Sequence, residues 1–300
     1  MSNKIKSAKT RGNKFGFWFF RVLIKTLGIR SAYAFLHMVA LYYLLFDRAA
    51  VIKSMPYIKR RFPNSSKHKI YLHIYRLFVS QGKQLIDRYV YLSNPDFFEF
   101  TLKENVDIYN IIKNKDKGFI ILTSHFGNWQ IGLAGLKYLA SRQLNILMRS
   151  ENNDSVKNTF RFQDKSVNFN IISPDQDFGG VLEITKALQL GEVVSIMGDR
   201  TYGSKSICVD FLGDKADFPI TAYQLAATVK CPVIFLHVIK KTTRQYSIHI
   251  EKVLHPELKS SENKQAGLKK WAGTYVEELE KLASEYPYQC FIFEDIWKKE

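Results

Sequence analysis

The chain has 300 residues, of which 46% are hydrophobic, and this is enough for one substantial core or for one domain with a membrane-binding arm. Its three cysteines are odd in number and form no CxxC pair, which argues against a disulfide framework or a zinc site and favours a reducing, cytoplasm-facing environment. The formal net charge of +16 lies wholly in residues 1–88, which hold 18 Lys or Arg and two acids, whereas residues 89–300 hold 26 of each sign.

Residues 1–90 are predicted to form a basic, aromatic-rich helical arm. The first 14 residues are polar and basic, residues 15–62 are typical of two or three helices interrupted near Gly28 and Pro56, and residues 70–90 carry apolar side chains at helical spacing. The longest apolar stretch, residues 31–46, is apolar on all sides and is shorter than the roughly 20 residues that span a bilayer.

This arm has several interpretations: a helix on an anionic membrane surface, a single membrane span, a soluble helix pair with a solvated basic face, or a nucleic-acid-binding arm. We favour the membrane surface, because binding to nucleic acid does not require a helix that is apolar on all sides. An anionic membrane is therefore an expected partner, and nucleic acid is not. Nothing at the amino terminus is typical of a cleavable signal peptide.

Residues 91–300 are predicted to form an α/β domain with a mostly parallel mixed sheet flanked by helices, because short apolar strands alternate with helical segments. Residues 211–219 are interpreted as a loop with two alternative roles: Phe218-Pro219 sets the entry turn of the next helix, or the loop lines a groove for an apolar chain. The expected strands are 97–102, 118–123, 144–149, 169–172, 193–197, 206–211, 233–240 and 246–250, and the expected helices are 106–114, 131–141, 154–165, 180–190, 220–229 and 264–285.

The most informative motif follows the apolar strand at residues 118–123, where His125 stands just before a helix. In open α/β sheets the carboxyl end of such a strand is where ligands bind, and a histidine there can act as a general base. A residue five places further on can fold back and hold one imidazole nitrogen, which leaves the other nitrogen free to take a proton from a substrate. That residue is Gln130.

Two further strands end in polar groups that can lie beside His125. Arg149 ends the strand 144–149, and Asp199 and Arg200 follow the strand 193–197. An arginine at such a place is suited to bind phosphate or an oxyanion. The alternatives are an ordinary solvated strand end for Arg149 and a local salt bridge between Asp199 and Arg200. The remaining histidines have no ligand-like spacing, and no metal site is predicted.

Taken together, these segments resemble the lysophospholipid acyltransferase superfamily, in particular its lipid A biosynthesis (late) acyltransferase branch. The resemblance covers nearly the whole chain and rests on the order of several short motifs: Ser124 to Trp129, Gly198 to Arg200, Val209 to Gly213, Phe218-Pro219 and Cys231 to Val233.

The resemblance implies a glycerol-phosphate-acyltransferase-like fold and an enzyme on the cytoplasmic face of the bacterial inner membrane. It would move a fatty acyl chain from acyl-carrier protein or acyl-CoA to a hydroxyl or amine of a lipid acceptor, with no metal or bound cofactor. His125 would be the base, with Gln130 and Asp199 as the other catalytic residues. Substrate binding is assigned to Asn128, Arg149, Asn153 and Arg200. Because acyl-carrier protein is strongly acidic, the basic arm would also attract this donor.

Gln130 departs from the family pattern, which has a carboxylate at this position. A glutamine can accept a hydrogen bond from an imidazole N–H, but it cannot stabilise the imidazolium that forms during proton transfer. Asp199 could take over this task. The alternative is a catalytically silent homologue that binds acyl chains or acyl-carrier protein.

Overall fold

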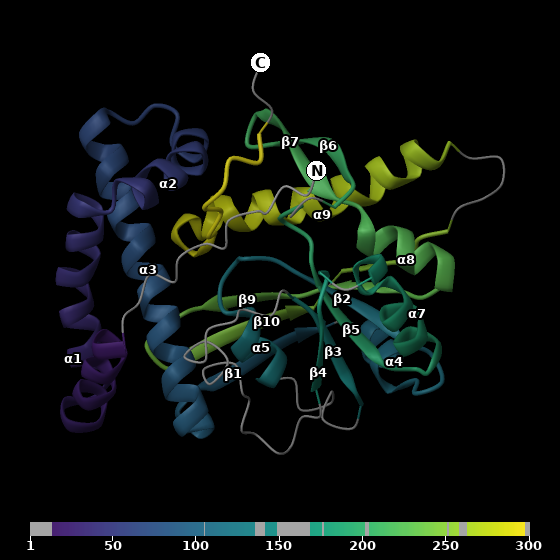
Figure 1. Cartoon of the computed structure of the whole chain (residues 1–300), viewed down its shortest axis with the longest axis horizontal. Coiled ribbons are helices and arrows are strands. Elements are labelled where there is room, and N and C mark those ends of the chain that lie inside the picture. Colours follow the sequence, from purple (N-terminus) through teal and green to yellow (C-terminus); the bar gives the residue numbers. More distant parts are fainter. Residues whose placement is uncertain are drawn as a thin grey trace.

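The computed structural model describes residues 14–104, 106–135, 142–148, 169–175, 177–201, 204–250, 252–257 and 263–297. It opens with three long helices, α1 (Lys14–Phe46), α2 (Arg48–Arg61) and α3 (Lys67–Ser93), which lie together on one side of the molecule (Figure 1). The predicted interruption at Gly28 is confirmed, since its φ of 79° and ψ of 175° break the helical path of α1.

The interruption predicted at Pro56 is wrong, because Pro56 lies inside α2. A proline there removes one backbone hydrogen bond. The helix continues because Tyr57 and Ile58, which follow directly, are both fully buried against the core.

The main sheet has six strands in the part of the chain that the structure describes, in the order β11-β8-β2-β5-β3-β4. All neighbours are parallel except β11 and β8, so the predicted mostly parallel mixed sheet is confirmed. Continuous apolar runs such as β2 and β5, buried on both faces, favour this arrangement. The strands are β2 (Phe119–Thr123), β3 (Leu144–Leu147), β4 (Phe169–Ile172), β5 (Val193–Met197), β8 (Val233–Phe235) and β11 (Val253–Leu254).

A second, smaller sheet has the order β1-β10-β9 and contains β1 (Glu99–Glu104), β9 (His237–Lys240) and β10 (Gln245–Ile250). The single strand predicted at 233–240 is therefore two strands in two sheets. The change of sheet occurs at Leu236, whose backbone N–H still donates to the carbonyl oxygen of Leu122 on β2 at 3.0 Å. Beyond it, Val238 of β9 forms an isolated bridge with Gly127, so the small sheet borders the turn that carries His125.

The loop predicted at 211–219 is also wrong, because β6 (Ser206–Phe211) and β7 (Asp214–Pro219) form an antiparallel hairpin. Its two-residue turn, Leu212-Gly213, has positive φ at both positions, which matches the twist of paired strands. The interpretation of this segment as the lining of a groove does not hold for Phe218, which is 1% exposed and packs edge-on against Phe211.

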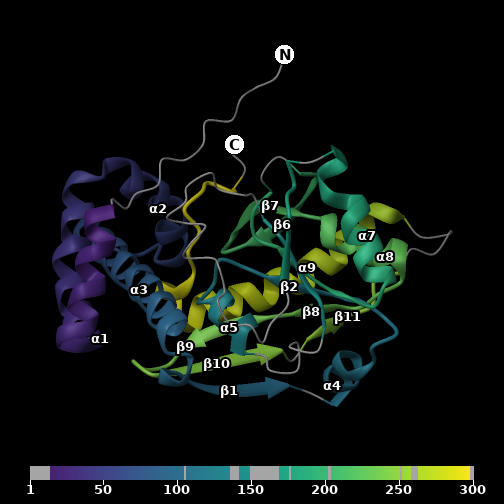
Figure 2. The same cartoon turned by 60° about the horizontal axis from the view of Figure 1, so that its bottom comes forward.

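Helices cover both faces of the main sheet (Figures 1 and 2). The predicted helix 131–141 begins earlier, at Trp129, and its part after Gly135 lies outside the described residues, as does the predicted helix 154–165. The other predicted helices and the strands not discussed above are present, with ends shifted by at most a few residues. The helices are α4 (Val106–Lys113), α5 (Trp129–Gly135), α7 (Val181–Gln189), α8 (Thr221–Val229) and α9 (Lys264–Glu285).

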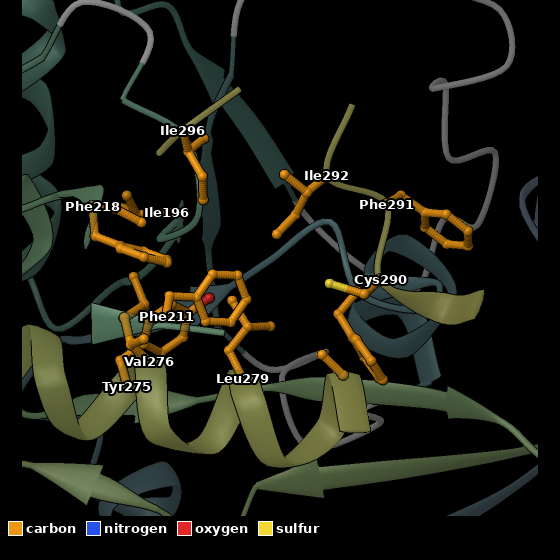
Figure 3. Close-up of a cluster of buried hydrophobic side chains, with 14 of the residues drawn as sticks. Ile196, Phe211, Phe218, Tyr275, Val276, Leu279, Cys290, Phe291, Ile292 and Ile296 are labelled. Atoms are coloured by element: carbon orange, nitrogen blue, oxygen red, sulfur yellow. The ribbon is translucent and has the colours of Figure 1, made fainter. Parts of the chain in front are cut away.

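The core on the α9 side of the sheet closes with the carboxy-terminal segment. Figure 3 shows Tyr275, Val276 and Leu279 of α9 pointing toward Phe211 and Phe218 of the hairpin. Cys290 and Ile292 of the last segment lie in the same buried cluster, each 1% exposed. The carboxy-terminal segment therefore completes this part of the core.

Candidate active site

His125 stands in a tight turn between β2 and α5. The turn lies against β9, because the backbone of Gly127, with φ of 60°, approaches so closely that an added Cβ would lie 1.5 Å from the carbonyl oxygen of Val238. Only glycine has both the conformational freedom and the small size that this position requires. The imidazole of His125 is partly open, with 24% of the side chain exposed.

The side chain that faces His125 is Asp199, in the segment after β5. Its two carboxylate oxygens lie 3.0 and 3.1 Å from the His125 Nδ1, and one of them also accepts the backbone N–H of His125 at 2.9 Å. Asp199 is 1% exposed. Burial alone would raise the pKa of its carboxyl, but the charge and hydrogen bonds of His125, together with the charge of Arg200, lower it below its usual value.

This geometry fixes the chemistry of the imidazole. A carboxylate that accepts from Nδ1–H keeps the neutral ring in the tautomer whose lone pair lies on Nε2. Nε2 can then take a proton from a bound hydroxyl or amine, while Asp199 stabilises the imidazolium that results. The pair has the arrangement that a base and its orienting acid have in a catalytic triad, and such a pair can act on a nucleophile that belongs to the substrate.

Asn128 links the turn directly to α3, and Arg200 binds the carboxy-terminal segment that contacts the turn. The buried Asn128 donates from Nδ2 to the carbonyl oxygen of Gln84 on α3 at 2.9 Å, and Arg200 donates from Nη2 to the carbonyl oxygen of Phe291 at 2.7 Å. Both were expected to bind substrate, and in this structure both bind backbone. Arg149 and Asn153, also expected to bind substrate, lie outside the described residues.

The carboxy-terminal segment supplies contacts that sequence reasoning missed. The Phe291 N–H donates to the carbonyl oxygen of His125 at 2.8 Å, and the Gly127 N–H donates to that of Gln289 at 2.8 Å. The side-chain amide of Gln289 in turn pairs with the backbone N–H and carbonyl of Lys240. These are mostly backbone contacts, so side-chain chemistry alone gives no signal for them.

The model of the family of bacterial lipid A biosynthesis acyltransferases matches residues 18–299. The chain belongs to this family. Among solved structures it is similar to the 1-acyl-sn-glycerophosphate (LPA) acyltransferase PlsC from Thermotoga maritima, with 18% identity, 87% of this chain and 95% of that chain covered, and a TM-score of 0.38. A likeness this distant does not transfer residue positions. No curated protein matches the chain significantly.

Membership in the lipid A acyltransferase family confirms the resemblance seen in the sequence and supports acyl transfer to a lipid. It also draws attention to Gln130, the position where the family pattern has a carboxylate. Gln130 is 2% exposed, and its Oε1 has no hydrogen-bond partner among the described residues. Within the same residues, the partner of the His125 Nδ1 is Asp199. The described residues contain no group of three His, Cys, Asp or Glu side chains placed to hold a metal ion.

Proposed function

We propose that this protein is a membrane-associated acyltransferase that moves a fatty acyl chain from acyl-carrier protein or acyl-CoA to a hydroxyl or amine of a lipid acceptor. The observation that carries the proposal is the contact between His125 and the buried Asp199 at the carboxyl ends of two adjacent parallel strands.

In the proposed reaction the His125 Nε2 removes the proton of the acceptor hydroxyl or amine as its oxygen or nitrogen attacks the thioester carbonyl. A new C–O or C–N bond forms, and a tetrahedral intermediate carries the negative charge on the former carbonyl oxygen. Collapse breaks the C–S bond, and the leaving thiolate takes the proton from the imidazolium of His125. Asp199 remains ionised throughout and stabilises the imidazolium.

The position of Asp199 favours an active enzyme over a silent homologue. The silent alternative depends on the missing carboxylate at residue 130. Because Asp199 supplies a carboxylate to the same imidazole, the amide of Gln130 need not perform this task. Asn128, Arg149, Asn153 and Arg200 stay candidates for binding the acceptor or its phosphate.

The membrane part of the proposal is supported by α1, the one helix in the described part of the chain that is long and apolar enough to cross a membrane. One side of it is buried, including Ala32, Leu36 and Ala40. Its other side leaves large apolar side chains exposed, which suits the apolar layer of a membrane. They include Trp18, Leu27, Met38, Leu41, Tyr42, Leu45 and Phe46.

Basic residues accompany this apolar side, as on helices that lie at an anionic membrane surface. Arg21, Lys25 and Arg30 of α1 are exposed, and so is Lys59 in the last turn of α2. We therefore place the enzyme at the cytoplasmic face of the inner membrane, where an acidic carrier protein would also meet this positive charge.

The test is transfer of a radiolabelled acyl chain from acyl-carrier protein, and separately from acyl-CoA, into a total membrane lipid extract. We expect a labelled lipid with the wild-type protein and none with His125→Ala. His255→Ala, which removes an exposed histidine elsewhere, is the matched control and keeps full activity. Label transfer that survives His125→Ala would contradict the role of His125. A wild-type protein that transfers label to no lipid from either donor would contradict the proposed enzyme.

A further inference from the structure

A second polar site lies in a cleft of about 450 Å³ under the carboxy-terminal half of α9. Its floor is the small sheet, where Lys103 on β1, His249 on β10 and His237 on β9 are direct register partners across the three strands. Residues that pair across adjacent strands point to the same face of a sheet. The cleft therefore has a row of three nitrogen-bearing side chains along its floor.

The cleft has an excess of positive charge. Four lysines line it, against two glutamates, Glu278 and Glu285. Glu278 is paired with Lys252 at 3.3 Å, and Glu285 accepts a hydrogen bond from the Tyr286 hydroxyl at 3.0 Å. Lys103 and Lys281 are exposed and have no ion pair within the described part of the chain. Their charges are therefore available to an anion in the cleft.

His237 is the unusual group of the floor. It is 5% exposed, and neither ring nitrogen has a hydrogen-bond partner among the described residues. Its ring lies against Phe126, with centroids 6.4 Å apart, and against Tyr275 of α9, with centroids 6.1 Å apart. A buried polar group without a partner costs free energy, so a ligand that hydrogen-bonds to this ring would recover part of that cost.

The chemistry of this floor favours a phosphate group over other anions. A neutral imidazole offers one N–H donor and one acceptor nitrogen. A monohydrogen phosphate has both P–O⁻ acceptors and a P–OH donor, so it can pair with either ring nitrogen. Both nitrogens of His237 are closed to solvent in this structure, so the ring must turn toward the cleft when the phosphate binds. Lysine ammonium groups bind phosphate as point charges. An ionised carboxylate has no donor and matches only one of the two nitrogens.

From these observations we propose that the cleft under α9 binds a phosphate group, which His237 contacts by hydrogen bonding and which Lys103 and Lys281 attract. The cleft borders the turn of the acyl-transfer site, since the ring of His237 lies against Phe126, but neither His125 nor Asp199 lines it. The phosphate belongs either to a soluble molecule or to a lipid headgroup, and the two sources are distinguished by experiment.

The test follows the ring nitrogens of the full-length, ¹⁵N-histidine-labelled protein by NMR in detergent, with His237 assigned from the spectrum of His237→Gln. Inorganic phosphate, coenzyme A and dihexanoyl phosphatidic acid are added separately, each against sodium chloride of equal ionic strength. We expect a saturable shift of the His237 signals that sodium chloride does not produce. Tighter binding of phosphatidic acid would indicate a lipid headgroup, and tighter binding of either soluble compound a soluble ligand.

The charge reversal Lys103→Glu/Lys281→Glu should raise the concentration of half-saturation about tenfold or more, since it replaces the attraction of two positive charges for the anion by repulsion. Lys269→Glu/Lys270→Glu, which reverses two exposed charges of α9 outside the cleft, is the matched control and should leave it unchanged. The proposal is overturned if no phosphate compound gives a saturable His237 shift, or if the two double variants behave alike.

Discussion

The carboxylate that faces His125 comes from Asp199, 74 residues further along the chain, rather than from the residue five places away. Asp199 can reach His125 because β2 and β5 are parallel neighbours, with Thr123 in register with Met197. Two residues beyond each strand, His125 and Asp199 then stand side by side. The sequence indicates this convergence of two strand ends, but spacing alone cannot show which of two candidate side chains reaches the imidazole.

A carboxylate at residue 130 should not improve this enzyme. In Gln130→Glu we expect turnover to stay at or below the wild-type rate. Asp199 already accepts the hydrogen bond of the His125 Nδ1, so a new acid at residue 130 would have no free ring nitrogen to orient. The free energy of unfolding should fall by about 1–3 kcal/mol, since a carboxyl replaces an amide at a site that is 2% exposed. Steady-state kinetics and urea unfolding measure the two effects. A large gain in turnover would mean that residue 130 is the natural partner of His125.

His237 should make the protein sensitive to mild acid. Burial, with His249 nearby, lowers its pKa from 6.5 to about 3, against the opposing charge of Asp199. Between these values the unfolded chain binds a proton that the folded chain does not, so stability falls as pH drops below 6.5. From pH 7.5 to pH 5 this histidine should account for a loss of about 2 kcal/mol. Urea unfolding of wild type and His237→Gln at both pH values isolates the contribution of His237, because the contributions of all groups common to both proteins cancel. Equal pH dependence in the two proteins would contradict the lowered pKa, because it would show that His237 has the same pKa in the folded and the unfolded chain.

At the scale of elements, apolar runs and helical spacing were enough to predict most strands and helices, and the mistakes have local causes. Residues 233–240 are apolar apart from His237 and Lys240, and nothing in this pattern shows that Leu236 passes the chain from one sheet to the other. In β7 the charges of Asp214, Lys215 and Asp217 conceal an alternation in which Ala216 and Phe218 are buried. Pro56 is tolerated in α2 because the free energy that the helix gains by packing on the core exceeds the cost of a proline in its interior.

The turn at Gly127 provides a test of how elements position the site. Gly127→Ala should destabilise the protein by about 3 kcal/mol or more and abolish activity, since the new methyl group would collide with the Val238 backbone. Gly213→Ala is the control, because Gly213 also has positive φ but open space around its Cα, and it should cost only about 1 kcal/mol. Thermal unfolding and acyl transfer measure both. Equal effects of the two changes would show that backbone conformation, rather than the close approach to β9, matters at Gly127.

At the scale of the whole molecule, the basic arm and the α/β part meet at a buried ionic cluster. Asp87 of α3 binds Lys240 of β9 at 2.5 Å and accepts hydrogen bonds from the hydroxyls of Tyr33 on α1 and Tyr246 on β10. The boundary predicted between residues 90 and 91 thus coincides with a packed junction, and the division into two domains stays a prediction. Sequence patterns cannot show such a junction, because its members lie far apart along the chain.

The exposed side of α1 should bind the enzyme to membranes. Leu45→Ser/Phe46→Ser removes two of its most exposed apolar side chains, and we expect it to weaken co-sedimentation with anionic vesicles by about tenfold or more, given the transfer free energy of such side chains. Leu182→Ser/Leu190→Ser, on α7 and directly after it, removes similarly exposed side chains and should leave sedimentation unchanged. Equal losses in both double variants would contradict a specific membrane face on α1.

The most direct test of the central claim compares Asp199→Asn with Gln130→Ala in acyl transfer from labelled acyl-carrier protein, after both variants are shown to fold. Asparagine keeps the shape of the side chain and removes its charge. By analogy with the acid-to-amide change in a serine protease triad, kcat should fall by up to about 10⁴-fold in Asp199→Asn, whereas Gln130→Ala should stay within about tenfold of wild type, a barrier change of roughly 1.4 kcal/mol. A nearly normal kcat in Asp199→Asn, or an equal collapse in Gln130→Ala, would contradict the assignment of Asp199 as the partner of His125.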